Sequence, residues 1–207
     1  MCFCAIFSAL QCRSSNGSPG IVHLEVALQV NHRAAVFRGR LGNQPDPVLV
    51  KFGPRVRREV SLLRRVRRVP RVPQVFFCGV AVGCGLPVMV VTFVPGPDLT
   101  GYKGLWTEWH SKLMLETLTG VHRCGIVHRD VKPDNIVVHN CTGEPWLIDF
   151  DCGCPEGTRG FSGTRAYASP DALRGGPAVP AHDLFSLRKV INQVSTTSSG
   201  STAIDEQ

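Results

Sequence analysis

The sequence predicts an α+β fold in two parts: a strand-rich first part with one helix, and a mainly helical second part. Apolar residues alternate loosely over residues 21–50, which is typical of antiparallel strands. Over residues 54–69, and again from residue 107 onward, they recur every three or four residues, which indicates amphipathic helices. We therefore expect an antiparallel sheet first and a helical part after it.

Length and composition set limits on the class of protein. With 207 residues, 43% of them hydrophobic, the chain can form one large domain or two small lobes and is too apolar for wholesale disorder. No uninterrupted apolar run approaches the roughly 18 residues that span a bilayer, so we expect no membrane span. The N-terminal residues lack the positively charged start of a secretory signal. We expect a cytoplasmic chain, with the nucleus as an alternative.

The cysteine pattern agrees with a reducing compartment. Nine cysteines are scattered without paired CxxC units, so neither a zinc site nor a disulfide framework is indicated. Cys152 and Cys154 are close enough to suggest a metal or redox site, but reduced, small hydrophobic side chains are the preferred interpretation.

The pattern divides the chain into four segments. Residues 1–20 are expected to be an N-terminal extension, residues 21–94 the first part, residues 95–194 the second part, and residues 195–207 a disordered polar tail. Within these we expect a strand over 47–52, a helix over 54–69, a hairpin of buried strands over 74–94, a helix from Thr107 to Val121, and a helix from near His182 to Val194.

Charge is concentrated in one stretch of the first part. The chain has a net charge of +7, and from Lys51 to Arg71 there are nine basic residues but a single acid, Glu59. The outer face of the 54–69 helix is therefore rich in arginine. It is either a solvated face or a docking surface for an acidic partner, and we consider nucleic acid unlikely there.

The residues with the clearest chemistry lie in the second part. Asp130 precedes Asn135 by five residues with Lys132 between them, and Asp149 follows an apolar run. Phosphoryl transfer needs a group that orients a hydroxyl and takes its proton, together with divalent metal that neutralises phosphate charge. A carboxylate suits the first task, and carboxylate and amide oxygens suit magnesium.

The segment 126–135 reads IVHRDVKPDN and resembles the HRDxKxxN catalytic loop of the eukaryotic protein kinase family. The resemblance implies a two-lobed kinase-like fold with an incomplete C-lobe, since only 24 residues follow Asp183. By the same resemblance, Asp130 accepts the proton of the substrate hydroxyl and Lys132 neutralises the transferring phosphate. Asn135 and Asp149 would then hold Mg²⁺.

Further segments resemble the family in the same order along the chain. Downstream, Gly163-Thr164 with Ser169-Pro170-Asp171 is similar to the family's GTxxYxAPE segment, and Asp183 begins a segment similar to its DxWSLG helix start. Upstream, Lys51 resembles the strand lysine and Glu59 its helix partner, although Glu59 could instead pair with Arg55 one turn back. The remaining residues that the resemblance implies for nucleotide binding are Val36, Val91, Thr92 and Val94.

The sequence also departs from the family pattern. Gln29, Asn31 and Ala34 stand where three glycines of the phosphate-covering loop are expected, and Asp151 stands where the DFG motif has glycine. Arg129 could be a plain surface cation or could clamp a phosphorylated Thr158 or Ser162.

The resemblance implies an enzyme, an ATP- and Mg²⁺-dependent serine/threonine kinase acting on protein substrates. The glycine replacements leave a catalytically weak or inactive binding or scaffold module as the alternative. The LIDFD segment, residues 147–151, leaves a small-molecule phosphotransferase as a third.

Overall fold

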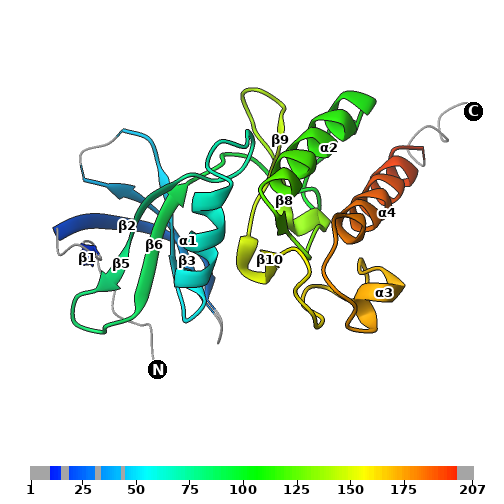
Figure 1. Cartoon of the computed structure of the whole chain (residues 1–207). Helices are drawn as coiled ribbons and strands as arrows, with labels where there is room; N and C mark the ends of the chain where they lie inside the picture. The colour runs from blue at the N-terminus through cyan, green and yellow to red at the C-terminus, as the bar shows by residue number, and fades with distance from the viewer. Residues whose placement is uncertain (1–9, 15–18, 31–33, 43–44, 200–207) are drawn as a thin grey trace, which may run out of the picture. The chain divides into compact units, whose positions relative to one another are not determined.

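The computed structural model describes residues 10–14, 19–30, 34–42 and 45–199. The chain divides into two compact units (Figure 1). Unit 1 comprises residues 1–67 and 73–93, and unit 2 comprises residues 68–72 and 94–207. Unit 1 carries all the long strands and one helix, whereas unit 2 carries the other helices and only short strands. The predicted α+β organisation in two parts is therefore confirmed.

Unit 1 is a closed antiparallel barrel with strand order β1-β2-β3-β4-β6-β5. Its strands are β1 (Leu10–Ser14), β2 (Pro19–Val30), β3 (Ala35–Leu41), β4 (Val48–Phe52), β5 (Val75–Ala81) and β6 (Pro87–Thr92). Alternate side chains point inward, so Val22, Val50, Val88 and Val90 are completely buried in the barrel core. β1 lies in the segment that we assigned to an N-terminal extension, and it closes the barrel by pairing with both β2 and β5.

The helix of unit 1 is α1 (Val56–Arg65), which packs against β5 and β6. It is held by Val56, Val60 and Leu63 on its buried face. The helix predicted over 54–69 ends four residues early, at Arg65. Beyond it Val69 belongs to unit 2, where its methyl groups lie against the backbone at Gly120. This packing, together with Pro70 just beyond it, draws the chain out of the helix.

Unit 2 is built around two long helices, α2 (Glu108–Arg123) and α4 (Pro180–Ser199), which contact each other. The other elements are β7 (Ile126–Val127), η1 (Pro133–Asn135), β8 (Ile136–Val138), β9 (Pro145–Leu147), η2 (Phe150–Cys152), β10 (Cys154–Pro155) and α3 (Pro170–Leu173). β8 pairs with β9, and β7 pairs with β10. Helix α4 continues past the predicted end at Val194, so residues 195–199 of the predicted tail are helical, and residues 200–207 lie outside the described residues.

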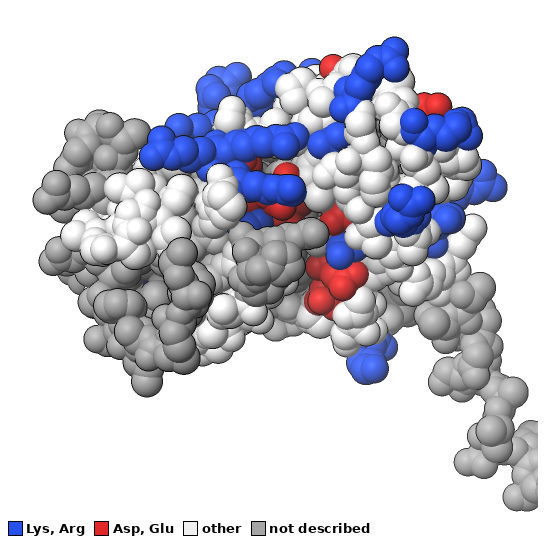
Figure 2. All heavy atoms as spheres, turned by 90° about the horizontal axis from the view of Figure 1, so that it is seen from below, with Lys and Arg blue, Asp and Glu red and all other residues white. Residues whose placement is uncertain are grey.

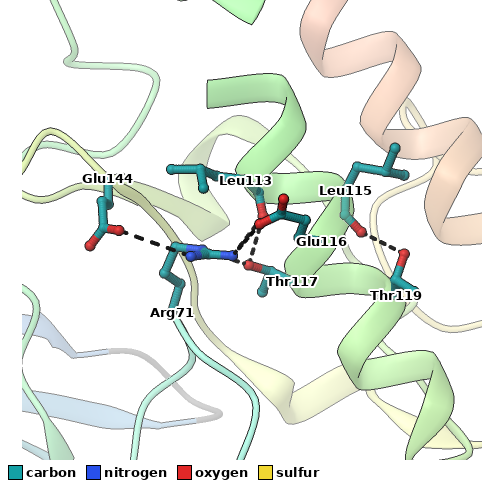
Figure 3. Close-up of polar contacts among 7 residues, drawn as sticks. All are labelled: Arg71, Leu113, Leu115, Glu116, Thr117, Thr119 and Glu144. Atoms are coloured by element: carbon teal, nitrogen blue, oxygen red, sulfur yellow. Dashed lines mark hydrogen bonds and ion pairs between the residues drawn. The ribbon is translucent and has the colours of Figure 1, made fainter. Parts of the chain in front are cut away.

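Arg71 fastens the segment 68–72 to the rest of unit 2 (Figure 3). Its guanidinium, in a side chain only 11% exposed, donates to Thr117 Oγ1 at 3.0 Å, to the Leu113 carbonyl at 3.3 Å and to Glu116 Oε2 at 3.2 Å. Its own carbonyl accepts a hydrogen bond from the amide of Leu147 in β9. The side chain and the backbone of Arg71 thus attach the segment 68–72 to both α2 and β9.

The start of α2 is closed by a capping box that uses histidine. The Thr107 amide donates to His110 Nδ1 at 3.1 Å, while the Thr107 side chain accepts from the backbone of His110. The His110 ring is 7% exposed and stacks on Trp106 with a centroid distance of 5.0 Å. Burial lowers the pKa of His110 below its ordinary value, against a smaller opposing effect of a hydrogen bond with the Gly143 backbone.

No helix among the described residues is both long enough and apolar enough to cross a membrane. All seven cysteines that the structure describes are free thiols.

We expect Arg71→Ala to lower the free energy of unfolding by about 1–3 kcal/mol, because Thr117 and a helix carbonyl lose a charged donor inside the fold. Urea denaturation of the whole chain measures this. Arg67→Ala, at an exposed position four residues earlier, is the matched control and should change stability little. Equal effects of the two substitutions would contradict the anchoring role.

We expect stability to fall as the pH is lowered through about 6.5, because the unfolded chain takes up the His110 proton before the folded chain does. His110→Gln keeps an acceptor for the Thr107 amide but does not titrate. The loss of urea midpoint between about pH 7.5 and 5.5 should therefore be smaller in this variant than in the wild type. An identical pH dependence in both would count against the capping role of the ring.

Candidate active site

The carboxylate of Asp130 is held from two sides in unit 2. Asn135 Nδ2 donates to Asp130 Oδ2 at 3.1 Å and to the Asp130 carbonyl at 2.8 Å. The Thr164 amide donates to the other carboxylate oxygen, Oδ1, at 2.8 Å. Because each oxygen accepts a hydrogen bond, the carboxylate is fixed in orientation.

Glycine is required beside this carboxylate. Gly163 has φ +112°, and a side chain there would collide with the Arg129 carbonyl oxygen. Only a residue without Cβ lets the 163–164 segment lie this close, and this approach brings the Thr164 amide to Asp130. The GT pair noted in the sequence thus has a direct physical function at the site.

His128 supports the loop from within the core. It is completely buried, and Nε2 donates to the Ile148 carbonyl at 3.1 Å while Nδ1 accepts from the Asp130 amide at 3.3 Å. Its ring packs edge-on against Phe150 with a centroid distance of 4.7 Å. With both ring nitrogens occupied, His128 acts as a structural side chain.

Asp183, at the start of α4, anchors the loop backbone. It is completely buried, and its two oxygens accept from the His128 and Arg129 amides, each at 2.8 Å. His122 Nε2 of α2 donates to Asp183 Oδ2 at 2.8 Å. A single carboxylate therefore joins the two long helices and the 128–130 loop.

Arg129 adopts a left-handed backbone conformation with φ +66°. Its Nε donates to the Cys152 carbonyl at 2.8 Å and its Nη1 to the Gly160 carbonyl at 3.1 Å. The guanidinium is thus not a plain surface cation, because it holds the backbone of the segment that carries Thr158 and Ser162. A clamp on a phosphorylated Thr158 or Ser162 stays a prediction.

Asn135 and Asp149 are brought together by the backbone, since the Ile148 amide donates to the Asn135 carbonyl at 2.9 Å. The amide nitrogen of Asn135 is used for Asp130, so its side-chain oxygen is the atom available to a cation. Asp149 has φ +61° and precedes the turn η2. This pair of oxygen donors fits Mg²⁺, which commonly takes one or two protein ligands and completes its shell with water and phosphate.

Three carboxylates lie near the thiol of Cys152. Burial is the main cause of the raised pKa of the Cys152 thiol, and the nearby carboxylates of Asp130, Asp151 and Asp149 add to it, against an opposing hydrogen bond with Ser162. The thiol therefore stays protonated at neutral pH and is a poor metal ligand. Within the described ranges, no group of three or more His, Cys, Asp or Glu side chains is arranged to hold a metal.

Lys132 lies on the same loop, two residues after Asp130. Its side chain is 23% exposed, and Nζ lies 3.9 Å from Asp134 Oδ2. This is a loose pair at the edge of the solvent, which leaves the ammonium able to turn toward an incoming anion.

In unit 1 the structure shows the expected contact between Lys51 and Glu59. Lys51 Nζ lies 2.8 Å from Glu59 Oε2, with the two side chains 12% and 3% exposed. The eight-residue separation is accommodated by a turn at Gly53-Pro54, after which α1 places Glu59 in its first turn. The alternative pairing of Glu59 with Arg55 stays a prediction.

The other residues predicted to bind nucleotide belong to β3, to β6 and to unit 2. Val36 of β3 is the register partner of Lys51, and Val91 of β6 is the partner of Leu49. The Thr92 hydroxyl accepts from the Gln74 amide at 3.0 Å, so it serves the sheet. Val94 belongs to unit 2.

The positions of the missing glycines are only partly described. Gln29 is in β2, Ala34 directly precedes β3, and Asn31 lies outside the described residues. Asp151, which stands at the position of the glycine in the DFG motif, lies within the short 3-10 helix η2. This position is therefore helical and carries a carboxylate.

A family model described as "Protein kinase domain" matches residues 50–202. Because the match covers well over half of the sequence, the chain belongs to the protein kinase domain family. The matched region contains Lys51, Glu59 and the whole 128–135 loop.

Named relatives are serine/threonine kinases. The chain is 36% identical over 118 residues to the probable serine/threonine-protein kinase PkwA of Thermomonospora curvata, covering 51% of this chain and 16% of that protein. It is 29% identical over 181 residues to serine/threonine-protein kinase F of Synechocystis sp., covering 79% of this chain and 33% of that protein. The chain thus matches a third or less of the length of these curated relatives.

A solved structure supports the fold. The protein kinase PK-1 of Cydia pomonella granulovirus superimposes with a TM-score of 0.72 at 19% identity, covering 84% of this chain and 70% of that one. The predicted kinase-like fold is confirmed.

The structure adds residues whose roles the sequence analysis did not predict. Asp183 and Thr164 lie in segments that resemble the family, but the sequence did not predict their contacts with the 128–130 loop. Asp183 is 54 residues from its partner Arg129, and Thr164 is 34 residues from its partner Asp130. His122 and Arg71 carried no sequence signal of their own, because a histidine or arginine in a polar context is usually a surface residue.

We expect Asp183→Ala to destabilise the chain by about 3 kcal/mol or more, because two buried amides lose their acceptor. Chemical denaturation measures the loss. Asp183→Asn keeps one acceptor oxygen and should fall between the wild type and the alanine variant. An alanine variant as stable as the wild type would contradict the anchoring role.

Proposed function

We propose that this chain is an ATP-dependent protein kinase that transfers the γ-phosphate to serine or threonine hydroxyls of protein substrates. The observation that carries the proposal is the orientation of Asp130 by Asn135 and Thr164, within a chain of the protein kinase domain family. A carboxylate held in this way is suited to orient a hydroxyl and to accept its proton.

The lysines and the oxygen donors serve the phosphates in this proposal. Lys132 neutralises charge on the transferring group, and Lys51, held by Glu59, binds the nucleotide phosphates. Asn135 and Asp149 would hold Mg²⁺, which when bound supplies positive charge against the phosphate oxygens. Val36, Val91, Thr92 and Val94 remain the residues proposed to line the nucleotide.

The proposal that the phosphate acceptor is serine or threonine rests on Lys132 and on the relatives, whose names describe them as serine/threonine kinases. Lysine two residues after the catalytic aspartate resembles the serine/threonine-directed branch of the family. The same relatives support the proposal that the substrates are proteins.

The second candidate is a kinase-like binding or scaffold module with weak or no activity. It is favoured by Gln29 and Ala34 at positions where glycine would let backbone amides approach phosphate. ATP binding separates the two candidates, because a nucleotide that binds only the folded chain raises its melting temperature.

An acidic partner at the arginine-rich segment 54–69, which contains α1, remains part of the proposal, as does a cytoplasmic or nuclear location. Lys and Arg cover more of the face in Figure 2 than Asp and Glu do, in keeping with the net charge of +7. Such a surface favours anionic partners in general.

We expect purified chain with ATP, Mg²⁺ and a mixture of basic proteins to transfer phosphate to serine and threonine, and Asp130→Asn to lower the rate by at least about 100-fold. Phosphoamino-acid analysis of radiolabelled product measures both.

The binding control uses thermal unfolding. Both the wild type and Asp130→Asn should gain melting temperature in millimolar ATP and Mg²⁺, because the substitution removes the proton acceptor and not the nucleotide contacts. Binding without transfer by the wild type would favour the scaffold module. Equal transfer by both proteins would disprove the assigned role of Asp130.

A further inference from the structure

Arg165 is an exposed arginine of unit 2 that lies directly beside the held carboxylate of Asp130. It follows Thr164, whose amide donates to Asp130 Oδ1 at 2.8 Å. Because consecutive Cα atoms are about 3.8 Å apart, the Arg165 side chain starts next to the group that would receive a substrate hydroxyl. A peptide whose hydroxyl reaches Asp130 therefore brings its neighbouring residues close to this guanidinium.

The guanidinium of Arg165 lies over an aromatic ring. Its Cζ is 5.7 Å from the centroid of the Phe161 ring, a contact that attracts a cation to the face of the ring. Among the described residues, no acid forms an ion pair with Arg165. The planar set of N–H donors is therefore available to a carboxylate, which it can bind through two hydrogen bonds.

The sequence on either side of Arg165 adds positive charge and no negative charge. From Gly157 to Pro170 there are two arginines, Arg159 and Arg165, and neither aspartate nor glutamate. Arg159 is exposed as well. This segment therefore favours a negatively charged neighbour over a positively charged one.

The backbone that carries Arg165 is fastened to α4. Lys189 Nζ donates to the Ala166 carbonyl at 2.9 Å, and Ser186 Oγ donates to the Tyr167 carbonyl at 2.9 Å. With the preceding amide bonded to the carboxylate, the segment is held on both sides of Arg165. Its position is thus set before a substrate binds, which lowers the entropic cost of any contact that it makes.

We propose that Arg165 makes this chain select substrates with an acidic residue within two positions of the phosphorylated serine or threonine. Two residues of extended chain span about 7 Å, which is comparable with the length of an arginine side chain. A lysine or arginine at the same substrate position meets a like charge, so the selection has an attractive and a repulsive part. This inference rests on the proposed function, because it concerns the substrates of the same site.

The experiment uses the full chain with ATP, Mg²⁺ and peptides that share one central serine in an uncharged background. Glutamate or lysine replaces one background residue at a time, from two positions before the serine to two positions after it. We expect kcat/KM to be at least about tenfold higher for glutamate than for lysine at one or more of these positions. The difference should shrink in about 0.5 M salt.

Variants assign the preference to the side chain. Arg165→Glu should make the lysine peptide the better substrate, Arg165→Gln should make the two peptides about equal, and Arg165→Lys should keep the preference for glutamate. Arg188→Glu is the matched control, because it makes the same change in charge at an exposed position of α4. Helix geometry places Arg188 about 100° from Lys189 and about 160° from Ser186, away from the face that holds the segment. It should leave the preference unchanged.

Binding keeps the test independent of catalysis. Peptides with alanine in place of the serine should bind the wild type at least about threefold more tightly with glutamate than with lysine, and the order should be reversed in Arg165→Glu. Fluorescence anisotropy measures this. Binding with this charge preference but no transfer to any peptide would refute the proposed function and support the role of Arg165.

The inference is wrong if transfer occurs with equal kcat/KM for the glutamate and lysine peptides. It is also wrong if both kinds of peptide bind equally, or if folded Arg165→Glu and Arg165→Gln keep the preference of the wild type. Thermal unfolding shows that each variant is folded.

Discussion

The buried carboxylate of Asp183 is the interaction on which the organisation of unit 2 depends. An unpaired carboxylate in this position would be very costly, so its three donors, the His128 and Arg129 amides and the His122 ring, must all be in place together. This requirement holds Arg129 in its left-handed conformation and directs the next residue, Asp130, toward Asn135 and Thr164. The chemistry of the loop is therefore set by a residue that takes no part in it.

The basic side chains of unit 1 around α1 lie in two different environments. Lys51 and Glu59 form a nearly buried pair, and the remaining basic side chains of α1 face solvent. The helix α1 is held against the barrel by the packing of Val56, Val60 and Leu63.

The strands β2 to β6, α1, α2 and the start of α4 were predictable because their apolar periods are strong and local. The contact of Lys51 with Glu59 was predictable for a different reason, since one acid among nine bases flanked by family-like motifs leaves few partners. The prediction was wrong about the end of α1 and the end of α4. Val69 lies outside the helix because it packs at Gly120, far along the chain. β1 joins the barrel by pairing with β5, which is also far along the chain.

The sequence by itself determined the class of this protein and the types of residue at its candidate site, because the HRDxKxxN spacing brings an acid, a lysine and an amide to one loop. Only the tertiary structure decided how these groups are held. The hydrogen bond from Thr164 to Asp130, the anchor at Asp183 and the attachment of Arg71 to α2 join residues separated by dozens of positions. Local propensity carries no information about such contacts, since they form only when packing has removed both partners from water.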